Sequence, residues 1–158
     1  MKASSFQFME MAQVHPRTIN IQTASLSEAV LVHGAIPEMK DADLSFFEER
    51  LKGKSYVCFI AYIEGASVGY AVRYDRYEDG SLYCWMGGVV PEGRRKGVMS
   101  HIMDETMSYA KEHGYTSLKL KTTPRHTSML KFLPADGWTL IPEGEKGDDK
   151  LLYEKPVI

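Results

Sequence analysis

Residues 85–100 read WMGGVVPEGRRKGVMS, and this stretch decides how the rest of the chain is interpreted. An apolar strand runs into a Pro-Glu-Gly turn, then a basic loop with one glycine, and then a long segment with helical periodicity. The first turn of a helix has unpaired backbone amides and the positive end of the helix dipole, so it attracts anions. The loop at 94–98 (RRKGV) therefore predicts a diphosphate-binding site, in which Gly97 lets oxygen atoms approach the backbone closely.

A simpler interpretation of this loop stays open. Basic turns are common on protein surfaces, and Gly97 would then only relieve backbone strain in a solvated turn. Two other phosphate-binding motifs are excluded, because the chain has neither a GxxxxGK[ST] sequence nor glycines at GxGxxG spacing after a first strand.

A glycine pair, Gly87-Gly88, interrupts the apolar strand before the turn. Consecutive glycines weaken a strand and are typical of a β-bulge or of a close approach by another group. A bulge here would leave unpaired backbone groups at Gly88, Val89 and Val90, which could pair with an amide-containing ligand as one strand pairs with another. The alternative is that the glycines accommodate tight packing of a helix.

The flanking segments predict a mixed α/β domain. Ser25 to Glu28 form a capping box at the start of a helix that ends near His33. A second helix fits residues 43–52, and the longest helix begins near Val98 and is followed by Gly114. The other expected elements are strands at 18–22, 55–63, 67–75, 81–91, 117–121, 138–141 and 151–154, with a short helix at 127–132.

Length and composition exclude several classes of protein. The 158 residues suit one domain, which we place at 18–158 after an N-terminal extension, 1–17, that fits neither helical nor strand periodicity. A net charge of −2 argues against nucleic acid as a partner. No secretory or membrane-spanning segment is apparent, so we expect a cytoplasmic protein that does not bind membranes. Cys58 and Cys84 lack metal-ligand spacing, so we expect reduced thiols and no metal.

Residues 89–99 (VVPEGRRKGVM) resemble the acyl-CoA signature of the GNAT N-acetyltransferase superfamily. The core of that signature is [Q/R]-x-x-G-x-[G/A] after a strand that ends in V-x-P, and the predicted element order over residues 18–155 is similar too. The resemblance implies an α/β (α+β) fold: a mixed, mostly antiparallel, splayed sheet of six to seven strands flanked by about four helices.

The resemblance also implies that acetyl-CoA binds in the gap of the splayed sheet. Its diphosphate would lie on the loop and the helix start, and its pantetheine arm would pair with the strand. The implied cofactor-binding residues are Gly88, Val89, Val90, Arg94, Arg95, Lys96, Gly97, Val98, Met99 and Ser100. The implied reaction is direct acetyl transfer to the amine of a small-molecule or amino-acid-like acceptor, assisted by a base and by an acid that protonates the leaving thiolate.

Three positions depart from the family pattern. Met99 stands where the signature has Gly or Ala, and the segment 122–125 (TTPR) replaces a frequent Asn. Leu133 occupies the position of a Tyr thought to protonate the thiolate in many members, and leucine has no proton to donate. The thiolate therefore leaves unassisted, through water, or with the help of another residue.

Two side chains are candidate catalytic residues. Tyr83 lies about eleven residues before Arg94, where some relatives carry a catalytic Glu; with an ordinary pKa of about 10 it would act by orienting a water. His126 can gain or lose a proton near neutral pH and precedes the short helix near the expected thiol. Structural roles, such as a core tyrosine, are the alternatives.

The acceptor is the least defined part of the prediction. Glu38, Asp75 and Glu78 are candidate substrate-binding residues in loops expected near the acceptor, where their charge would favour a cationic amine. Two other functions stay open: a non-catalytic acyl-CoA binding or sensing domain, suggested by Leu133, and an α/β interaction module whose basic turn contacts another anion. Homodimer formation is also left open.

Overall fold

The computed structural model describes residues 18–39 and 41–158, so the predicted N-terminal extension lies outside the described residues. One seven-stranded sheet has the order β1-β2-β3-β4-β5-β7-β6. The strands are β1 (Ile19–Ala24), β2 (Tyr56–Ile63), β3 (Ala66–Tyr74), β4 (Ser81–Val89), β5 (Ser117–Thr122), β6 (Thr139–Ile141) and β7 (Leu151–Pro156). The helices are α2 (Leu26–Gly34), α3 (Leu44–Leu51), α4 (Val98–Glu112) and α5 (Thr127–Ala135), with the short 3-10 helix η1 (Pro91–Gly93).

These elements confirm the predicted fold class and element order, and the predicted ends differ from the observed ones by three residues at most. Helix α2 begins where the capping box places it, because the Ser25 hydroxyl accepts a hydrogen bond from the Glu28 amide at 3.2 Å. In return, the Glu28 carboxylate accepts one from the Ser25 amide at 2.9 Å. Across the described ranges, no helix is long and apolar enough to span a bilayer.

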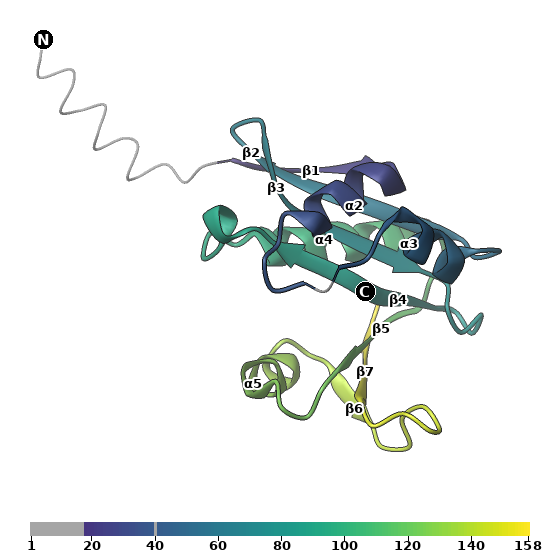
Figure 1. The fold of residues 1–158 in the computed structure, drawn as a ribbon. Coiled ribbons are helices and arrows are strands. Elements are labelled where there is room, and N and C mark those ends of the chain that lie inside the picture. The colour runs from purple at the N-terminus through teal and green to yellow at the C-terminus, as the bar shows by residue number, and fades with distance from the viewer. Residues whose placement is uncertain (1–17, 40) are drawn as a thin grey trace, which may run out of the picture.

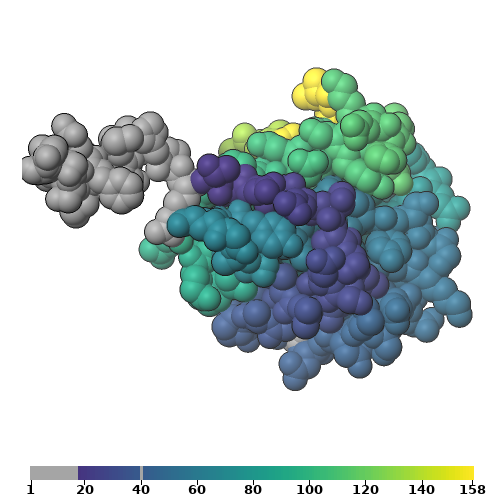
Figure 2. Space-filling view, turned by 90° about the horizontal axis from the view of Figure 1, so that it is seen from above, coloured from purple at the N-terminus to yellow at the C-terminus, as the bar shows by residue number. Residues whose placement is uncertain are grey.

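The first four strands form an antiparallel sheet with helices on both faces. Helices α2 and α3 cover one face and α4 lies behind the other (Figure 1). Fully buried Phe47, Tyr70 and Ile102 belong to one core cluster that joins these helices to the strands. Figure 2 shows the purple residues of β1 and α2 lying against the teal hairpin of β2 and β3, so the helix packs directly on the sheet.

The sheet splays between β4 and β5. These strands are parallel and pair only from Ser81 with Ser117 to Tyr83 with Lys119. Beyond Tyr83 the two strands diverge. Strands β5, β7 and β6 pair with one another and turn away from β4, and α5 lies with them (Figure 1). Within the described chain, no strand pairs with β4 on that side from residue 84 to residue 89. The backbone edge of β4 therefore faces a gap.

The bulge predicted at Gly87-Gly88 is wrong in position. Both glycines pair regularly with β3, whereas the β3–β4 register shifts by one residue and skips Trp85. Trp85 packs with its ring 5.3 Å from that of Phe47 on α3, so the bulge turns a large aromatic side chain toward this helix. Packing of that half-buried indole on α3, rather than local glycine content, accounts for where the β3–β4 register shifts.

The glycine pair instead accommodates close neighbours. A Cβ atom on Gly88 would lie 2.6 Å from Met39 Cε and 2.8 Å from Ile36 Cδ1, both in the loop that follows α2. A Cβ atom on Gly87 would lie 3.1 Å from the carbonyl oxygen of Tyr70. The glycines thus allow close packing, but the tight contacts come from a loop and a strand, and the helix atom nearest a Cβ on Gly87, Met99 Cε, is at an ordinary 3.6 Å.

A polar cluster links the two halves of the splayed sheet. Glu145, in the loop between β6 and β7, forms an ion pair with Arg76 at 2.8 Å and one with Lys121 at 3.0 Å. Its other contact is the Tyr77 hydroxyl, which donates a hydrogen bond at 2.8 Å. Burial alone would raise the pKa of Glu145, but these bonds outweigh it and lower the pKa to about 2. The cluster thus holds the carboxylate ionised and fixes the loop.

Replacing Glu145 by Gln is expected to make the protein less sensitive to acid. A carboxylate whose pKa is lowered by folding stabilises the native state above its unfolded pKa of about 4.3, and that contribution is lost as the pH falls toward 2. With a third of the side chain exposed, the contribution is about 1 kcal/mol after solvent screening. Urea unfolding between about pH 6 and pH 3 measures it. Glu143→Gln is the control. If the free energy of unfolding of E145Q fell with pH as steeply as that of wild type and of the control, the assignment would be contradicted.

Candidate active site

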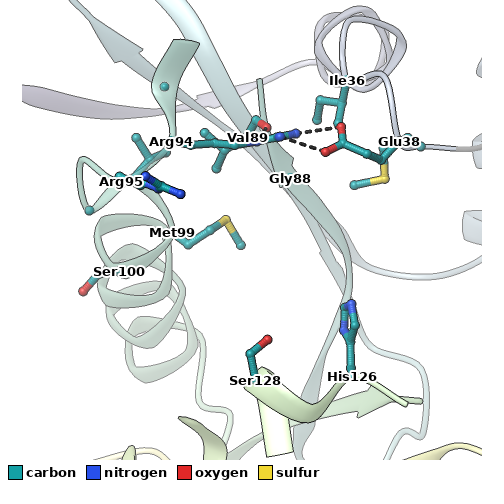
Figure 3. Close-up of a pocket in the computed structure, with 14 residues that line it drawn as sticks. Ile36, Glu38, Gly88, Val89, Arg94, Arg95, Met99, Ser100, His126 and Ser128 are labelled. Carbon is teal, nitrogen blue, oxygen red and sulfur yellow. Dashed lines mark hydrogen bonds and ion pairs between the residues drawn. The ribbon is translucent and has the colours of Figure 1, made fainter. Parts of the chain in front are cut away.

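A cavity of about 690 Å³ lies between β4, the start of α4 and the start of α5, beneath the loop that follows α2 (Figure 3). It opens on the part of β4 that no strand covers in the described chain. Its walls come from three stretches far apart in the sequence, and the lining residues are Ile36, Glu38, Met39, Gly88, Val89, Gly93, Arg94, Arg95, Gly97, Val98, Met99, Ser100, His126 and Ser128.

The start of α4 provides backbone hydrogen-bond donors to this cavity. Gly97 precedes the helix in the left-handed conformation, with φ of 83°, and no described side chain caps the helix there. The first hydrogen bond of this helix runs from the His101 amide to the Gly97 carbonyl at 3.1 Å. The amides of residues 98–100 therefore have no acceptor within the helix. Arg95 also has positive φ, at 62°, which is strained for a residue with a Cβ. This backbone arrangement is suited to binding an anion.

Eight of the ten predicted cofactor-binding residues line the cavity; Val90 and Lys96 do not. The Val90 amide donates to the Val68 carbonyl at 2.9 Å, which ties it to β3. The Lys96 ammonium donates to the Glu92 carbonyl at 2.7 Å within its own loop. The structure therefore brings the predicted strand segment and the helix start together in one cavity. The side chain of Lys96 and the amide of Val90 do not take part, because both are bonded elsewhere.

Met99, at the Gly or Ala position of the family signature, points into the cavity rather than away from it (Figure 3). Its Cε atom would lie 3.6 Å from a Cβ on Gly87, so the side chain extends from α4 across to β4. The Arg95 side chain points into the same space, whereas the Ser100 hydroxyl points away from it (Figure 3). Met99 therefore narrows the cavity between helix and strand and gives it an apolar wall.

Arg94 and Glu38 form an ion pair across the mouth of the cavity (Figure 3). Arg94 Nη1 lies 2.7 Å from a Glu38 oxygen, and Arg94 Nε donates to the Val89 carbonyl at 3.1 Å. The hydrogen bond from Arg94 holds the pKa of Glu38 below its usual value. The first arginine of the signature thus fastens the loop after α2 to β4.

A Glu38→Gln variant is expected to bind CoA about threefold more tightly at low salt. The substitution removes a negative charge from the mouth of a cavity that we expect to hold a polyanion, and it leaves Arg94 in place. Titration calorimetry at two salt concentrations measures the change, which should shrink as salt rises. Glu105→Gln, on an exposed position of α4, is the control with the same change in net charge. Equal CoA affinities for all three proteins at low salt would argue against this location.

His126 is the predicted catalytic residue that lies in the cavity. It precedes the first residue of α5, and its ring points toward the cavity together with the Ser128 hydroxyl (Figure 3). The other ionisable lining residues are Glu38, Arg94 and Arg95, two of which are paired with each other. Among the described lining residues, an imidazole is the side chain suited to gaining and losing a proton near neutral pH.

Tyr83, the other predicted catalytic residue, is buried in β4 and does not line the cavity. Its ring packs edge-on against Tyr74 at 5.7 Å, and the Arg76 guanidinium lies 4.9 Å from the ring centre. Burial raises the pKa of the hydroxyl to about 12, so it stays protonated at neutral pH. Tyr83 is placed to donate a hydrogen bond rather than to accept a proton.

Of the three predicted substrate-binding carboxylates, only Glu38 lines the cavity. Asp75 and Glu78 lie in the β3–β4 hairpin loop, where the Glu78 amide donates to the Asp75 carboxylate at 3.0 Å. Glu78 also forms an ion pair with Lys54 at 3.1 Å. These two carboxylates therefore organise the hairpin loop and are not brought together with Glu38.

Leu133 is fully buried in the second core cluster, with Leu118 and Trp138. An apolar side chain thus occupies the position of the usual tyrosine, and no proton donor replaces it there. Sequence reasoning also missed Ile36, Met39, Gly93 and Ser128 as lining residues, although Gly93 lies within the quoted signature. Ser128 stands in the first turn of a predicted helix beside His126, which could have identified it; Ile36 and Met39 carry no such signal.

An open strand edge beside an uncapped helix start, in a sheet that splays between its fourth and fifth strands, is the arrangement of an acyl-CoA-dependent N-acyltransferase. The sequence matches the model of the acetyltransferase (GNAT) family over residues 23–137, and the chain belongs to that family. A comparison with curated protein sequences finds no match.

Solved structures share this fold at low sequence identity. The ribosomal-protein-S18-alanine N-acetyltransferase from Escherichia coli is 13% identical, with a TM-score of 0.70 over 89% of this chain and 94% of that one. Ard1 from Thermoplasma volcanium is 19% identical, with a TM-score of 0.66 over 89% and 98% of the two chains. The PaiA N-acetyltransferase from Thermoplasma acidophilum, a complex with coenzyme A, is 12% identical, with a TM-score of 0.66 over 88% and 99%.

Proposed function

We propose that this acetyltransferase moves the acetyl group of acetyl-CoA directly to the amine of a small-molecule or amino-acid-like acceptor. The observation that carries the proposal is that the uncovered edge of β4 and the uncapped start of α4 meet in one cavity. A diphosphate-bearing thioester with an amide-containing arm suits both walls, since the helix start attracts its phosphates and the strand edge offers hydrogen bonds to its amides.

The backbone amides of residues 98–100 would bind the diphosphate, and the Arg95 side chain, which points into the cavity, would neutralise part of its charge. The edge of β4 at Gly88 and Val89 would orient the arm. The Val89 carbonyl is bonded to Arg94 in this structure, so pairing there requires the arginine to move or to share that oxygen. Catalysis by this arrangement rests on positioning.

His126 would take the proton that the acceptor amine loses when its nitrogen attacks the thioester carbonyl carbon. In that step a C–N bond forms, the C–S bond breaks, and sulfur leaves with the electron pair. Tyr83, which stays protonated and does not line the cavity, would take no direct part in this step. No covalent enzyme intermediate is required.

A thiol-release assay with a panel of amines tests the proposal. The panel contains amino acids, diamines and short peptides with free N-termini, and mass spectrometry identifies the acetylated product. Release of CoA together with an N-acetylated amine is the expected result. Binding of acetyl-CoA with no turnover of any amine would favour the sensing domain suggested by Leu133. An unchanged melting temperature in saturating CoA would favour the interaction module instead.

A further inference from the structure

Arg73 on β3 is a buried cation with uncharged partners. Its side chain faces α4 and the residue is 3% exposed. Nε donates to the Thr106 hydroxyl at 3.2 Å, Nη1 to the Met86 carbonyl at 3.3 Å and Nη2 to the Met103 sulfur at 3.4 Å. Within residues 18–39 and 41–158, no carboxylate forms an ion pair with it.

This arrangement is costly in a native protein. A guanidinium keeps its charge in proteins, and buried charges are ordinarily paired with an opposite charge because desolvation strongly opposes their burial. Three neutral acceptors give each nitrogen of the Arg73 guanidinium one hydrogen bond but leave its charge uncompensated. In a water-poor region that charge would stabilise an anion placed nearby far more than it would in solvent.

The guanidinium lies beside the β4 bulge, three residues along the strand from the cavity-lining Val89. Met86, which it contacts, follows the skipped residue Trp85, and Met103 is one helical turn beyond the cavity-lining Met99. From Val89 to Met86 the strand advances three residues, about 10 Å. An extended thioester arm that starts at the helix and follows the edge of β4 reaches this position, and its sulfur would then lie near Arg73.

We propose that Arg73 stabilises the thiolate that leaves during acetyl transfer; this inference rests on the proposed function. The C–S bond breaks with both electrons on sulfur, while the proton of the amine goes to His126. Leu133 has no proton to give. In the proposed step the sulfur would leave unassisted, as an anion, and a fixed cation would lower the free energy of that anion. Arg73 acts through its charge and positions no proton.

The groups around Arg73 do not compete for this role. Cys84 lies opposite it on β4, and burial raises the pKa of this thiol; burial likewise raises the pKa of Tyr70 on β3. Burial therefore favours the neutral form of both side chains. Strand β2 places Val57 beside Arg73, and α4 contributes Met103 and Thr106, which carry no charge. His126 stands across the cavity.

The test compares the affinities of CoA and desulfo-CoA from about pH 7 to pH 10 by titration calorimetry. Desulfo-CoA lacks the thiol, so any pH dependence that is common to both ligands cancels in the ratio of their affinities. For wild type, the preference for CoA should rise at least about tenfold with pH, the factor that one pKa unit represents. Arg73→Lys, which keeps the charge, should retain most of this rise. Arg73→Gln, which keeps hydrogen bonding without the charge, should lose it.

Several outcomes would overturn the inference. An Arg73→Gln variant with the full wild-type rise, or a wild-type ratio that is flat with pH, shows that the cation does not act on the sulfur. Loss of desulfo-CoA binding in both variants shows that Arg73 is a structural residue only. If wild type binds neither CoA nor desulfo-CoA, the proposed function itself fails, which is a different result from a flat ratio.

Discussion

Replacing Gly97 by glutamate is expected to weaken CoA binding at least about hundredfold, or about 2.7 kcal/mol of binding free energy. Gly97 immediately precedes α4, beside the amides proposed to bind the diphosphate. A carboxylate there repels phosphate oxygens. The Cβ of the glutamate also fills space through which a ligand could otherwise approach the backbone. Calorimetric titration of wild type and variant with CoA measures the loss.

Backbone strain has to be separated from charge in this experiment, because Gly97 has φ of 83°. Gly114→Glu is the matched control: this glycine follows α4 with φ of 79°, and a Cβ there meets no atom within 4 Å. It should lose similar stability through strain and bind CoA normally. Gly97→Ala, which adds strain without charge, should fall between wild type and Gly97→Glu. Equal CoA affinity for wild type and Gly97→Glu would show that the diphosphate binds elsewhere.

Replacing His126 by Gln is expected to lower kcat by about 10²- to 10⁴-fold, the range that general acid–base catalysis supplies. The amide of glutamine fills similar space at the start of α5 but accepts no proton near neutral pH. Because the residue is proposed to move a proton rather than to bind CoA, the Kd of CoA should change little. The pH dependence of kcat should also lose its acidic limb.

His113→Gln is the control for this substitution, since His113 lies at the far end of α4, where its ring stacks on Tyr109 at a centroid distance of 3.9 Å. It should leave kcat and its pH profile unchanged. If His126→Gln retained the wild-type kcat with the acceptor found in the amine panel, proton transfer would have to occur directly to water or to another group.

Local physical chemistry accounts for the part of the fold that the sequence predicts well. The Ser25–Glu28 capping box, the alternation in 117–121 and the helical spacing after Val98 are each decided within a few residues. The predicted anion-binding loop is equally local, because it depends on one glycine and the start of one helix. The splay follows from the family resemblance, and the three-residue pairing of β4 with β5 confirms it.

The features that sequence reasoning missed depend on contacts between distant residues. The bulge lies at Trp85 because the indole packs on α3, which the strand sequence alone does not show. In the sequence, Glu145 is one of several carboxylates in an acidic loop. Only the fold places it beside Arg76, 69 residues earlier. Arg73 reads as a polar residue near the end of a strand, and only the packing of α4 buries it.

Hydrogen exchange with and without CoA tests the central claim most directly, because it reports on the strand edge and the helix start themselves. We predict that CoA slows exchange in peptides covering residues 84–90 and 95–101, and leaves the peptide of β1, at the far edge of the sheet, unchanged. Binding of CoA with no added protection in those two segments, or with protection confined to other parts of the chain, would contradict the account.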